Sequence, residues 1–329
     1  MSAAPDHVRA WARERSQARA ARDWVEADRL RSEIESAGWR IVDRGTDFSL
    51  EPIHPSDVLE DGRARYGSSA SVPSRLAEPD SAVATVILLA TDQPADLART
   101  VAALRAYAPA ATEVVIVADG ASPEQEAALL AADGPAVAEI GGRPVAIVWT
   151  SQPLGYAAAL NIGLHRAGGQ VVILLDTSIE PTGDLVSQLV QLLGDRSVAV
   201  AGPWGITSDD LRRFVEAPPG DVDAIEAYAL AFRRADLIER GLLDERFRFY
   251  RNLDIWWSLV LRDEGVDRPP RRAVRIADPA AVRHEHRGYS SLEPAERDRL
   301  SKRNFYRIVH RFGARRDLLV SAADPAPKA

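Results

Sequence analysis

Apolar residues between 83 and 202 alternate between runs typical of buried strands and spacings typical of helices. Strand-like runs rich in Val, Ile, Leu and Ala cover 83–90, 113–118, 145–150, 170–175 and 197–202. Helix-like segments lie between them, at 95–107, 123–132, 155–167 and 183–193. Apolar strands that alternate with helices are typical of a mainly parallel sheet covered on both faces. The pattern therefore predicts an α/β fold.

Beyond residue 202 the alternation is less regular but still predicts further elements. We expect strands and helices over Ala224–Arg233 (strand), Phe247–Glu264 (helical centre), Arg272–Ala277 (strand) and Pro294–Phe312 (helix). Together with the preceding run, these elements predict one α/β domain over 83–316, followed by a tail over 317–329.

The first 82 residues follow a different pattern. Apolar positions at Trp11, Ala18, Val25 and Leu30 form a stripe along two predicted helices between residues 7 and 38. Residues 39–50 then have the pattern of strand, turn and strand. We therefore predict a small helical hairpin module over 1–50. Residues 51–82 are rich in Pro, Ser, Gly and charge without periodicity, which predicts a linker.

Composition narrows the possible functional classes. The 329 residues include no cysteine, which excludes disulfides and thiolate metal sites and fits a reducing compartment. The net charge of -7 argues against a general nucleic-acid coat. No segment approaches the roughly 20 apolar residues of a membrane-spanning helix, so we expect a cytoplasmic protein. The arginines from Arg297 to Arg316 predict a solvated helix face, with peripheral contact to anionic lipids as the alternative.

Two acidic residues stand directly after predicted strands. Asp119 follows Glu113–Ala118, and Asp176 follows the strand over 170–175. Because the carboxyl ends of parallel strands meet at one edge of a sheet, we expect both carboxylates in one crevice, suited to a nucleotide and its metal. No G-x-G-x-x-G follows the first strand and no Walker A sequence occurs, which argues against a dinucleotide oxidoreductase and a P-loop ATPase.

Five motifs occur in order between residues 84 and 313. They are Val117-Ala118-Asp119-Gly120-Ala121-Ser122, Gly155-Tyr156-Ala157-Ala158-Ala159-Leu160-Asn161-Ile162-Gly163, Leu175-Asp176-Thr177-Ser178-Ile179-Glu180-Pro181, Gly241-Leu242-Leu243-Asp244-Glu245-Arg246-Phe247 with Asn252-Leu253-Asp254-Ile255-Trp256-Trp257, and His284-Glu285-His286-Arg287-Gly288-Tyr289-Ser290. In this order they resemble family 2 glycosyltransferases of the GT-A (nucleotide-diphospho-sugar transferase) fold. The resemblance implies transfer of a sugar from a nucleotide-diphosphate sugar to an unknown acceptor hydroxyl, with inversion.

The resemblance also implies roles for individual residues. On the nucleotide-sugar side it indicates Asp119, Ser122, Gly155, Asn161, Asp176 and Ser178. On the acceptor or diphosphate side it indicates Asn252, Trp256, Trp257, His284, His286 and Arg287. Asp254 would be the catalytic base that removes the proton from the attacking hydroxyl. Because Trp256 and Trp257 are adjacent, they cannot share one helix face, so we expect one in the core and one along the acceptor groove.

Two positions depart from the family pattern. Ser178 stands where the metal-coordinating Asp of the D-x-D loop is usual, and hard cations favour carboxylates over a neutral hydroxyl. Asn252 stands at the first position of an acceptor-side motif that usually has acids at both ends.

Alternatives for the metal and for the function follow from these departures. A divalent cation, Mn²⁺ or Mg²⁺, would be bound by Asp176 with His284 or His286. Alternatively, both histidines and Arg287 would bind the diphosphate directly. The alternative function is a catalytically weakened nucleotide-sugar-binding or scaffold protein of the same fold.

Residues 7–50 carry a second and shorter resemblance. Three stretches of this segment are similar to the C-terminal tail of cysteinyl-tRNA synthetases. They are the run from Arg19 to Arg31, Ala37-Gly38-Trp39 and Val42-Asp43-Arg44-Gly45-Thr46. The adenylate-forming HIGH-type and KMSKS-type motifs of that enzyme occur nowhere in the chain, so synthetase activity is not implied. We expect a module used for packing or for a partner, with tRNA contact as the alternative.

Overall fold

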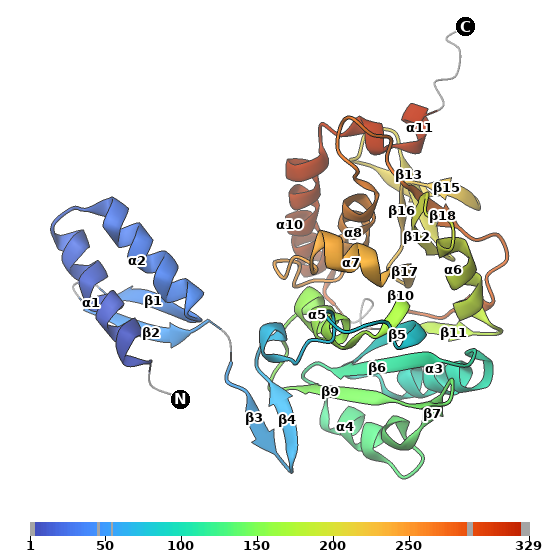
Figure 1. Ribbon diagram of the computed structural model, residues 1–329, viewed down its shortest axis with the longest axis horizontal. Helices are drawn as coiled ribbons and strands as arrows, with labels where there is room; N and C mark the ends of the chain where they lie inside the picture. The colour runs from blue at the N-terminus through green and yellow to red at the C-terminus, as the bar shows by residue number, and fades with distance from the viewer. Residues whose placement is uncertain (1–3, 45–46, 54, 288–291, 324–329) are drawn as a thin grey trace, which may run out of the picture.

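The structure is a computed structural model that describes residues 4–44, 47–53, 55–287 and 292–323. Figure 1 shows a small N-terminal module beside a larger α/β domain. Throughout the described residues, every helix is too short or too polar to cross a membrane.

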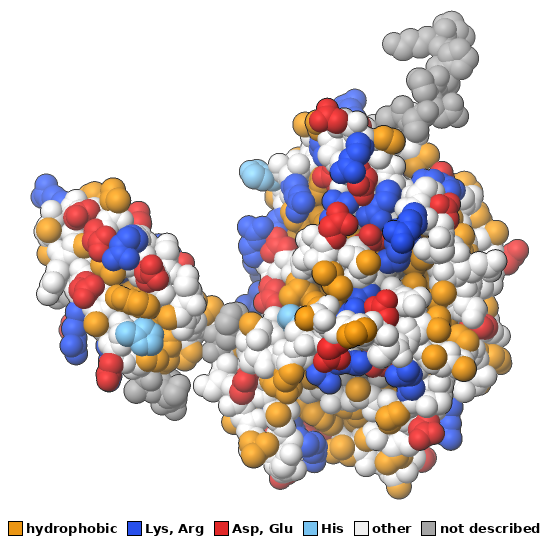
Figure 2. Space-filling model, in the orientation of Figure 1, with side chains coloured by type: hydrophobic (Ala, Val, Ile, Leu, Met, Phe, Trp, Pro, Cys, Tyr) orange, Lys and Arg blue, Asp and Glu red, His pale blue; other side chains and the backbone are white. Residues whose placement is uncertain are grey.

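The N-terminal module consists of two helices packed on a strand pair. Its elements are α1 (Asp6–Ala20), α2 (Trp24–Ser36), β1 (Trp39–Arg44) and β2 (Asp47–Pro52). Residues from both helices and from β1 are buried together, namely Val8, Ala12, Ile34 and Trp39. Figure 2 shows acidic, basic and hydrophobic side chains intermixed on the visible face of this module. The two predicted helices and the predicted strand pair are therefore present, with a small core of their own.

A ten-stranded sheet organises the larger domain, in the spatial order β15-β18-β12-β17-β10-β5-β6-β9-β4-β3. Its centre consists of four parallel strands, β10 (Gly169–Leu175), β5 (Ala82–Ala90), β6 (Thr112–Ala118) and β9 (Ala146–Thr150). The chain runs from β5 outward to β6 and β9, and then returns to β10 on the other side of β5. Open α/β sheets bind ligands at such a reversal, beyond the carboxyl ends of the strands.

One half of the sheet contains an antiparallel strand. β17 (Ala229–Arg233) lies between β10 and β12 (Val198–Gly202) and runs antiparallel to both. β17 therefore begins at the edge where β10 ends. The single strand predicted over Ala224–Arg233 is wrong, because residues 226–228 leave the strand geometry and β16 (Ala224–Ile225) joins a separate small sheet.

Helices cover both faces of the sheet (Figure 1). One face carries α3 (Pro94–Tyr107), α4 (Pro123–Leu130) and α6 (Leu185–Leu193). The other carries α5 (Tyr156–Arg166), α7 (Arg234–Arg240), α8 (Leu253–Arg262) and α10 (Pro294–Phe312). Side chains of a strand point alternately to the two faces, so in β5 Val86 and Leu88 join one core cluster and Ile87 the other. The predicted mainly parallel α/β fold is confirmed.

The remaining elements are short. They are β7 (Glu139–Ile140), β8 (Arg143–Pro144), β11 (Ile179–Pro181), β13 (Gly205–Ser208), β14 (Phe214–Glu216), β15 (Gly220–Val222), β18 (Arg272–Arg275), β19 (Ala281–Arg283), α11 (Val320–Ala323) and 3₁₀ turns at Ser69–Ser71, Pro135–Val137 and Arg316–Leu318.

Two predicted boundaries differ from the structure. Within the predicted linker, β3 (Val58–Glu60) and β4 (Arg63–Tyr66) form a hairpin, and β4 pairs in parallel with β9. The sequence did not predict β4 because its arginines are typical of an exposed linker. In the structure, Arg65 bonds to Glu126 on α4 at 2.7 Å and lies over the ring of Trp149. The predicted tail also begins inside the domain.

The start of that predicted tail is buried. Leu318 and Leu319 belong to the core cluster beneath α8 and α10. The backbone N–H of Val320 donates to a carboxylate oxygen of Asp223 at 2.7 Å. Residues 317–323 are therefore part of the α/β domain.

Candidate functional site

Two adjoining cavities lie at the switch point of the sheet. The first cavity, about 430 Å³, is lined by the carboxyl ends of β5, β6 and β10 and by the start of α5. The second cavity, about 730 Å³, is lined by residues 226–228 and by parts of α8 and α10. Tyr156, Asp176, Tyr250 and His286 line both. The two cavities therefore meet at these four side chains.

Asp119 lies in the wall of the first cavity, directly after β6. Its carboxylate accepts hydrogen bonds from the backbone N–H of Leu154 at 2.8 Å and from the hydroxyl of Thr150 at 3.3 Å. Burial raises the pKa of Asp119, and these hydrogen bonds offset part of that effect. Asp119 thus fixes the loop that leads into α5.

Gly155 lies at the N-cap of α5 with a φ of 101°, a region that favours glycine. A Cβ at this position would lie 3.2 Å from that of Arg248. The next two backbone N–H groups, of Tyr156 and Ala157, donate to the carbonyls of Arg248 and Phe247 at 3.0 and 3.1 Å. The start of α5 is therefore bound to the loop that follows residue 246 and lies against the first cavity.

Asp176 joins the two cavities at the end of β10. One carboxylate oxygen accepts hydrogen bonds from both the backbone N–H (2.8 Å) and the hydroxyl of Ser178. The other oxygen lies 3.2 Å from Nε2 of His286, whose ring stacks on Tyr250. Burial acts to raise the pKa of Asp176, but His286 and Ser178 outweigh it and lower the pKa. Burial acts to lower the pKa of His286, but Asp176 outweighs it and raises that pKa.

The fit of these side chains to a divalent cation depends on how many oxygen ligands they offer. Within the described residues, no group of three His, Cys, Asp or Glu side chains is arranged to hold a metal. Both oxygens of Asp176 already have partners in Ser178 and His286, and the Ser178 hydroxyl acts as a donor to Asp176. Hard cations prefer several oxygen ligands, so a divalent cation at Asp176 would have to displace these partners.

Asp254 is the half-buried acid of the second cavity, in the first turn of α8. It accepts a hydrogen bond from the backbone N–H of Ala227 at 3.1 Å, and burial raises its pKa. Glu226 lines the same cavity, and its pKa is raised by burial and then by the negative charge of Asp254. Two carboxyl groups with raised pKa values therefore face this cavity. Such groups are suited to accept protons.

The structure separates the two predicted histidines. His286 lines both cavities, whereas Nε2 of His284 lies 2.7 Å from a carboxylate oxygen of Glu180. Of the two histidines predicted as alternative metal ligands, His286 is therefore the one that lies beside Asp176. Arg287 lines the first cavity, with its Nε 3.8 Å from the carboxylate of Asp96.

Two other predicted residues have clear local roles. The hydroxyl of Ser122 accepts a hydrogen bond from the backbone N–H of Gln125 and so caps α4. Asn252 lines the second cavity, and its side-chain amide donates to the carbonyl of Ser301 at 3.0 Å, which ties the start of α8 to α10.

Asn161 lies away from both cavities, contrary to its predicted place beside the nucleotide-sugar. Only 1% of it is exposed, and its side chain exchanges hydrogen bonds with the backbone of Leu243 at 2.9 and 3.0 Å. It also donates to Glu245 at 3.0 Å. A buried amide needs such partners, so Asn161 braces α5 against the following loop.

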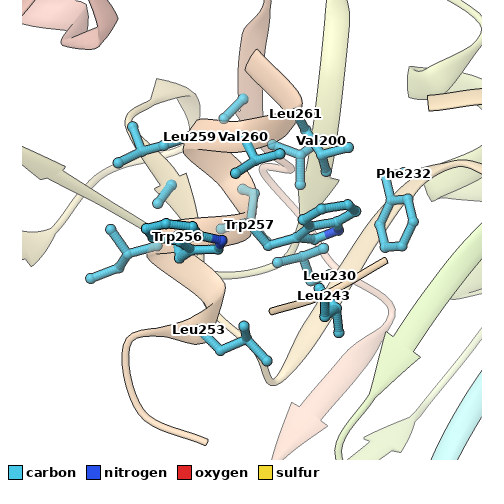
Figure 3. Close-up of a cluster of buried hydrophobic side chains, with 14 of the residues drawn as sticks. Val200, Leu230, Phe232, Leu243, Leu253, Trp256, Trp257, Leu259, Val260 and Leu261 are labelled. Carbon is cyan, nitrogen blue, oxygen red and sulfur yellow. The ribbon is translucent and has the colours of Figure 1, made fainter. Parts of the chain in front are cut away.

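Trp256 and Trp257 are both largely buried and line neither of these two cavities, although the prediction places one of them along the acceptor groove. They are 6% and 2% exposed. Figure 3 shows them on two sides of α8, with Trp257 directed toward Phe232. The rings of Trp257 and Phe232 pack edge to face at 5.5 Å, whereas Trp256 packs on Phe247 and Phe312. Two adjacent residues on one helix can both be buried because α8 lies between the sheet and α10.

Several residues that line the cavities were not predicted as site residues from the sequence. They are Asp96, Tyr156, Glu226, Tyr228, Arg248, Tyr250, Arg251 and Lys302. Most of them lie in loops or helices far from the strand ends in sequence. An acid inside an apolar helical pattern could have indicated Asp96, which is 3% exposed on α3.

Comparisons with known proteins agree with this architecture. Residues 85–246 match the family model described as glycosyl transferase family 2. The fold is similar to that of GalNAc-T7, solved with UDP, GalNAc and Mn²⁺, with a TM-score of 0.52 and 18% identity over 70% of this chain and 48% of that chain. This chain therefore spans about half of GalNAc-T7. The predicted GT-A fold and the predicted family are confirmed.

Two further similarities are more limited. The mannosyltransferase PcManGT from Pyrobaculum calidifontis, solved in complex with GDP-Man and Mn²⁺, is 17% identical, with 79% of each chain covered and a TM-score of 0.47. Cysteine--tRNA ligase 1 of Burkholderia lata is 51% identical over 39 residues, which are 12% of this chain and 8% of the ligase.

Proposed function

We propose, since residues 85–246 belong to glycosyl transferase family 2, that the chain transfers a sugar from a nucleotide-diphosphate sugar to an acceptor hydroxyl. The observation that carries the proposal is the meeting of the two cavities at Asp176 and His286, with Asp254 in the second cavity. Donor and acceptor would then approach each other from different sides of one junction.

The first cavity would hold the nucleotide-diphosphate sugar. Arg248, His286 and Arg287 face it, and the pKa of His286 is raised. When the sugar leaves, negative charge builds up on the diphosphate. Cationic groups in a preorganised site stabilise that charge in the transition state. This arrangement supports direct recognition of the diphosphate by side chains of the chain itself.

The second cavity would hold the acceptor, with Asp254 as the base. Asp254 would take the proton of the acceptor hydroxyl while its oxygen attacks the anomeric carbon of the sugar. The bond from that carbon to the diphosphate oxygen breaks, and the nucleoside diphosphate leaves. A single displacement of this kind inverts the anomeric configuration. General base catalysis is worth about 10²–10⁴-fold.

The experiment that tests this function has two stages. A thermal-shift screen with UDP, GDP, dTDP and their common sugars, with and without Mn²⁺ or Mg²⁺, identifies the donor. A ligand at 100 times its Kd stabilises by about 2.7 kcal/mol. Release of nucleoside diphosphate is then measured across a panel of acceptors. A chain that binds none of these nucleotides at millimolar concentration would contradict the proposal.

A second candidate function is a nucleotide-sugar-binding or scaffold protein of the same fold. It is favoured by Ser178, because this residue supplies a hydrogen-bond donor to Asp176 where a second carboxylate is usual in the family. Nucleotide binding without sugar release under any metal condition or with any acceptor would support this candidate over the transferase.

A further inference from the structure

A third cavity lies apart from the site described above. It is a groove of about 790 Å³ between α10, α8 and residues 240–246, and it shares no lining residue with the first or second cavity. We call it the arginine groove. Its charged lining residues are five arginines, one histidine and a single carboxylate, namely Arg240, Arg246, Arg303, Arg307, Arg311, His310 and Asp244. This excess of positive charge stands out in a chain whose net charge is -7.

Three of these arginines form a stripe along α10. Arg303, Arg307 and Arg311 are spaced four residues apart, so they follow one another at about 6 Å along the helix axis. Like charges at this spacing destabilise a helix. None of the three forms an ion pair with the residues that the structure describes, unlike Arg240 and Arg246, which pair with Glu264 and Asp244. The helix therefore keeps a repulsive arrangement that an anion would relieve.

Aromatic side chains hold this stripe in place. The guanidinium of Arg307 lies 5.9 Å from the ring centre of Phe247, and that of Arg311 lies 4.9 Å from the ring centre of Trp256. The buried Nε atoms of Arg240 and Arg307 have no hydrogen-bond partner among the described residues. The guanidiniums of Arg307 and Arg311 are thus positioned against fixed rings, and neither forms an ion pair with the described residues.

We propose that the arginine groove binds a short linear oligophosphate, a chain of at least three phosphate groups. Arginine recognises phosphate through paired N–H donors, and an extended chain of phosphates can reach more than one arginine of the stripe. A single anion would use only one arginine of the three. The site is separate from the proposed donor and acceptor cavities and does not depend on their function.

The test uses the full chain and sodium tripolyphosphate as the probe, measured by isothermal titration calorimetry in a phosphate-free buffer. We expect one bound equivalent, with an affinity that falls as salt is raised. The double variant Arg303→Gln and Arg307→Gln should weaken binding by at least about tenfold, because charge-assisted hydrogen bonds are lost. Both residues lie on α10 outside the proposed catalytic cavities.

The matched control removes two arginines from elsewhere. Arg105→Gln and Arg196→Gln, both exposed and outside the three cavities, change net charge equally and should leave affinity within about twofold. Equal losses in both double variants would reduce the effect to net charge and overturn the proposal. An unchanged affinity in the α10 variant would also overturn it. Thermal melts establish that each variant is folded.

Two further arms exclude other sites and other ligands. Saturation with a nucleoside diphosphate should leave tripolyphosphate binding unchanged, whereas displacement would place the probe in the first cavity and overturn the proposal. Tighter binding to anionic phospholipid vesicles, or to a single-stranded oligonucleotide of equal charge, would overturn it in favour of a membrane or a nucleic acid.

Discussion

The first and second cavities share four side chains but differ in how their acids are used. In the first cavity the carboxylates of Asp119 and Asp176 already accept hydrogen bonds from the protein. In the second, burial raises the pKa values of Asp254 and Glu226, and the charge of Asp254 raises that of Glu226 further, while Asp254 accepts hydrogen bonds from the backbone N–H groups of Ala227 and Ile255. The two cavities therefore differ in charge: Asp176 is paired with His286 at the first, whereas the second has two neighbouring acids, which supports the proposal that proton transfer takes place there.

The largest effect on the difference between the two cavities is expected from neutralising the proposed base. Asp254→Asn keeps the shape of the side chain but cannot take a proton. We expect kcat to fall by about 10²–10⁴-fold, with the Kd for nucleotide unchanged. Steady-state kinetics and calorimetry on the same preparation measure both. If the variant keeps wild-type kcat, Asp254 is not the base.

The next largest effect is expected on stability, from a residue that lines neither cavity. Asn161→Ala removes the buried amide that bonds Leu243 and Glu245. Leaving buried backbone groups unsatisfied costs about 1–3 kcal/mol, so we expect a lower free energy of unfolding in urea. The Kd for nucleotide should change less than threefold. A large loss of affinity without a loss of stability would instead place Asn161 at the nucleotide.

A variant that gains a metal-binding carboxylate tests the description of the first cavity. Ser178→Asp adds a second carboxylate beside Asp176, at a position that is 3% exposed. Mn²⁺ should then stabilise the variant, by about 1.4 kcal/mol at ten times its Kd, because it relieves the repulsion between two close acids. The wild type, with a neutral donor at 178, is the control. Equal Mn²⁺ stabilisation of both proteins would contradict this account of Ser178.

The smallest effect concerns the pair at the junction and its pH dependence. The lowered pKa of Asp176 contributes stability above the ordinary value of 3.8, and that stability is lost as pH falls through the folded pKa. The raised pKa of His286 contributes stability below the ordinary value of 6.5, and that stability is lost as pH rises through the folded pKa. The pair therefore stabilises most between these limits.

Removing the imidazole should abolish the upper limit. For His286→Gln we expect a Tm lower than that of the wild type by on the order of 2 °C near pH 5.5, with the difference disappearing at alkaline pH. Thermal melts at closely spaced pH values measure this. His284→Gln is the matched control, since His284 pairs with Glu180 rather than Asp176. A constant difference across pH would contradict the assignment.

The sequence predicted the sheet well and the site only in part. Long apolar strands and the acids that end them, Asp119 and Asp176, are local signals, and both acids line the first cavity. The placement of Asn161, Trp256 and Trp257 depends on which elements pack against α5 and α8. Residue type and spacing do not encode that packing. The short strand β4 was missed because a strand of four residues shows no periodicity.

Residues 226–228, just before β17, contact both Asp176 at the junction and Asp254 of the second cavity. The backbone N–H of Ala227 donates to Asp254, and the carbonyl of Tyr228 accepts from the N–H of Asp176 at 2.9 Å. An inserted residue here would break both bonds or shift β17 by one position, which turns each of its side chains to the opposite face. In evolutionary terms, this three-residue connection is a place where chain length is constrained even if side chains vary.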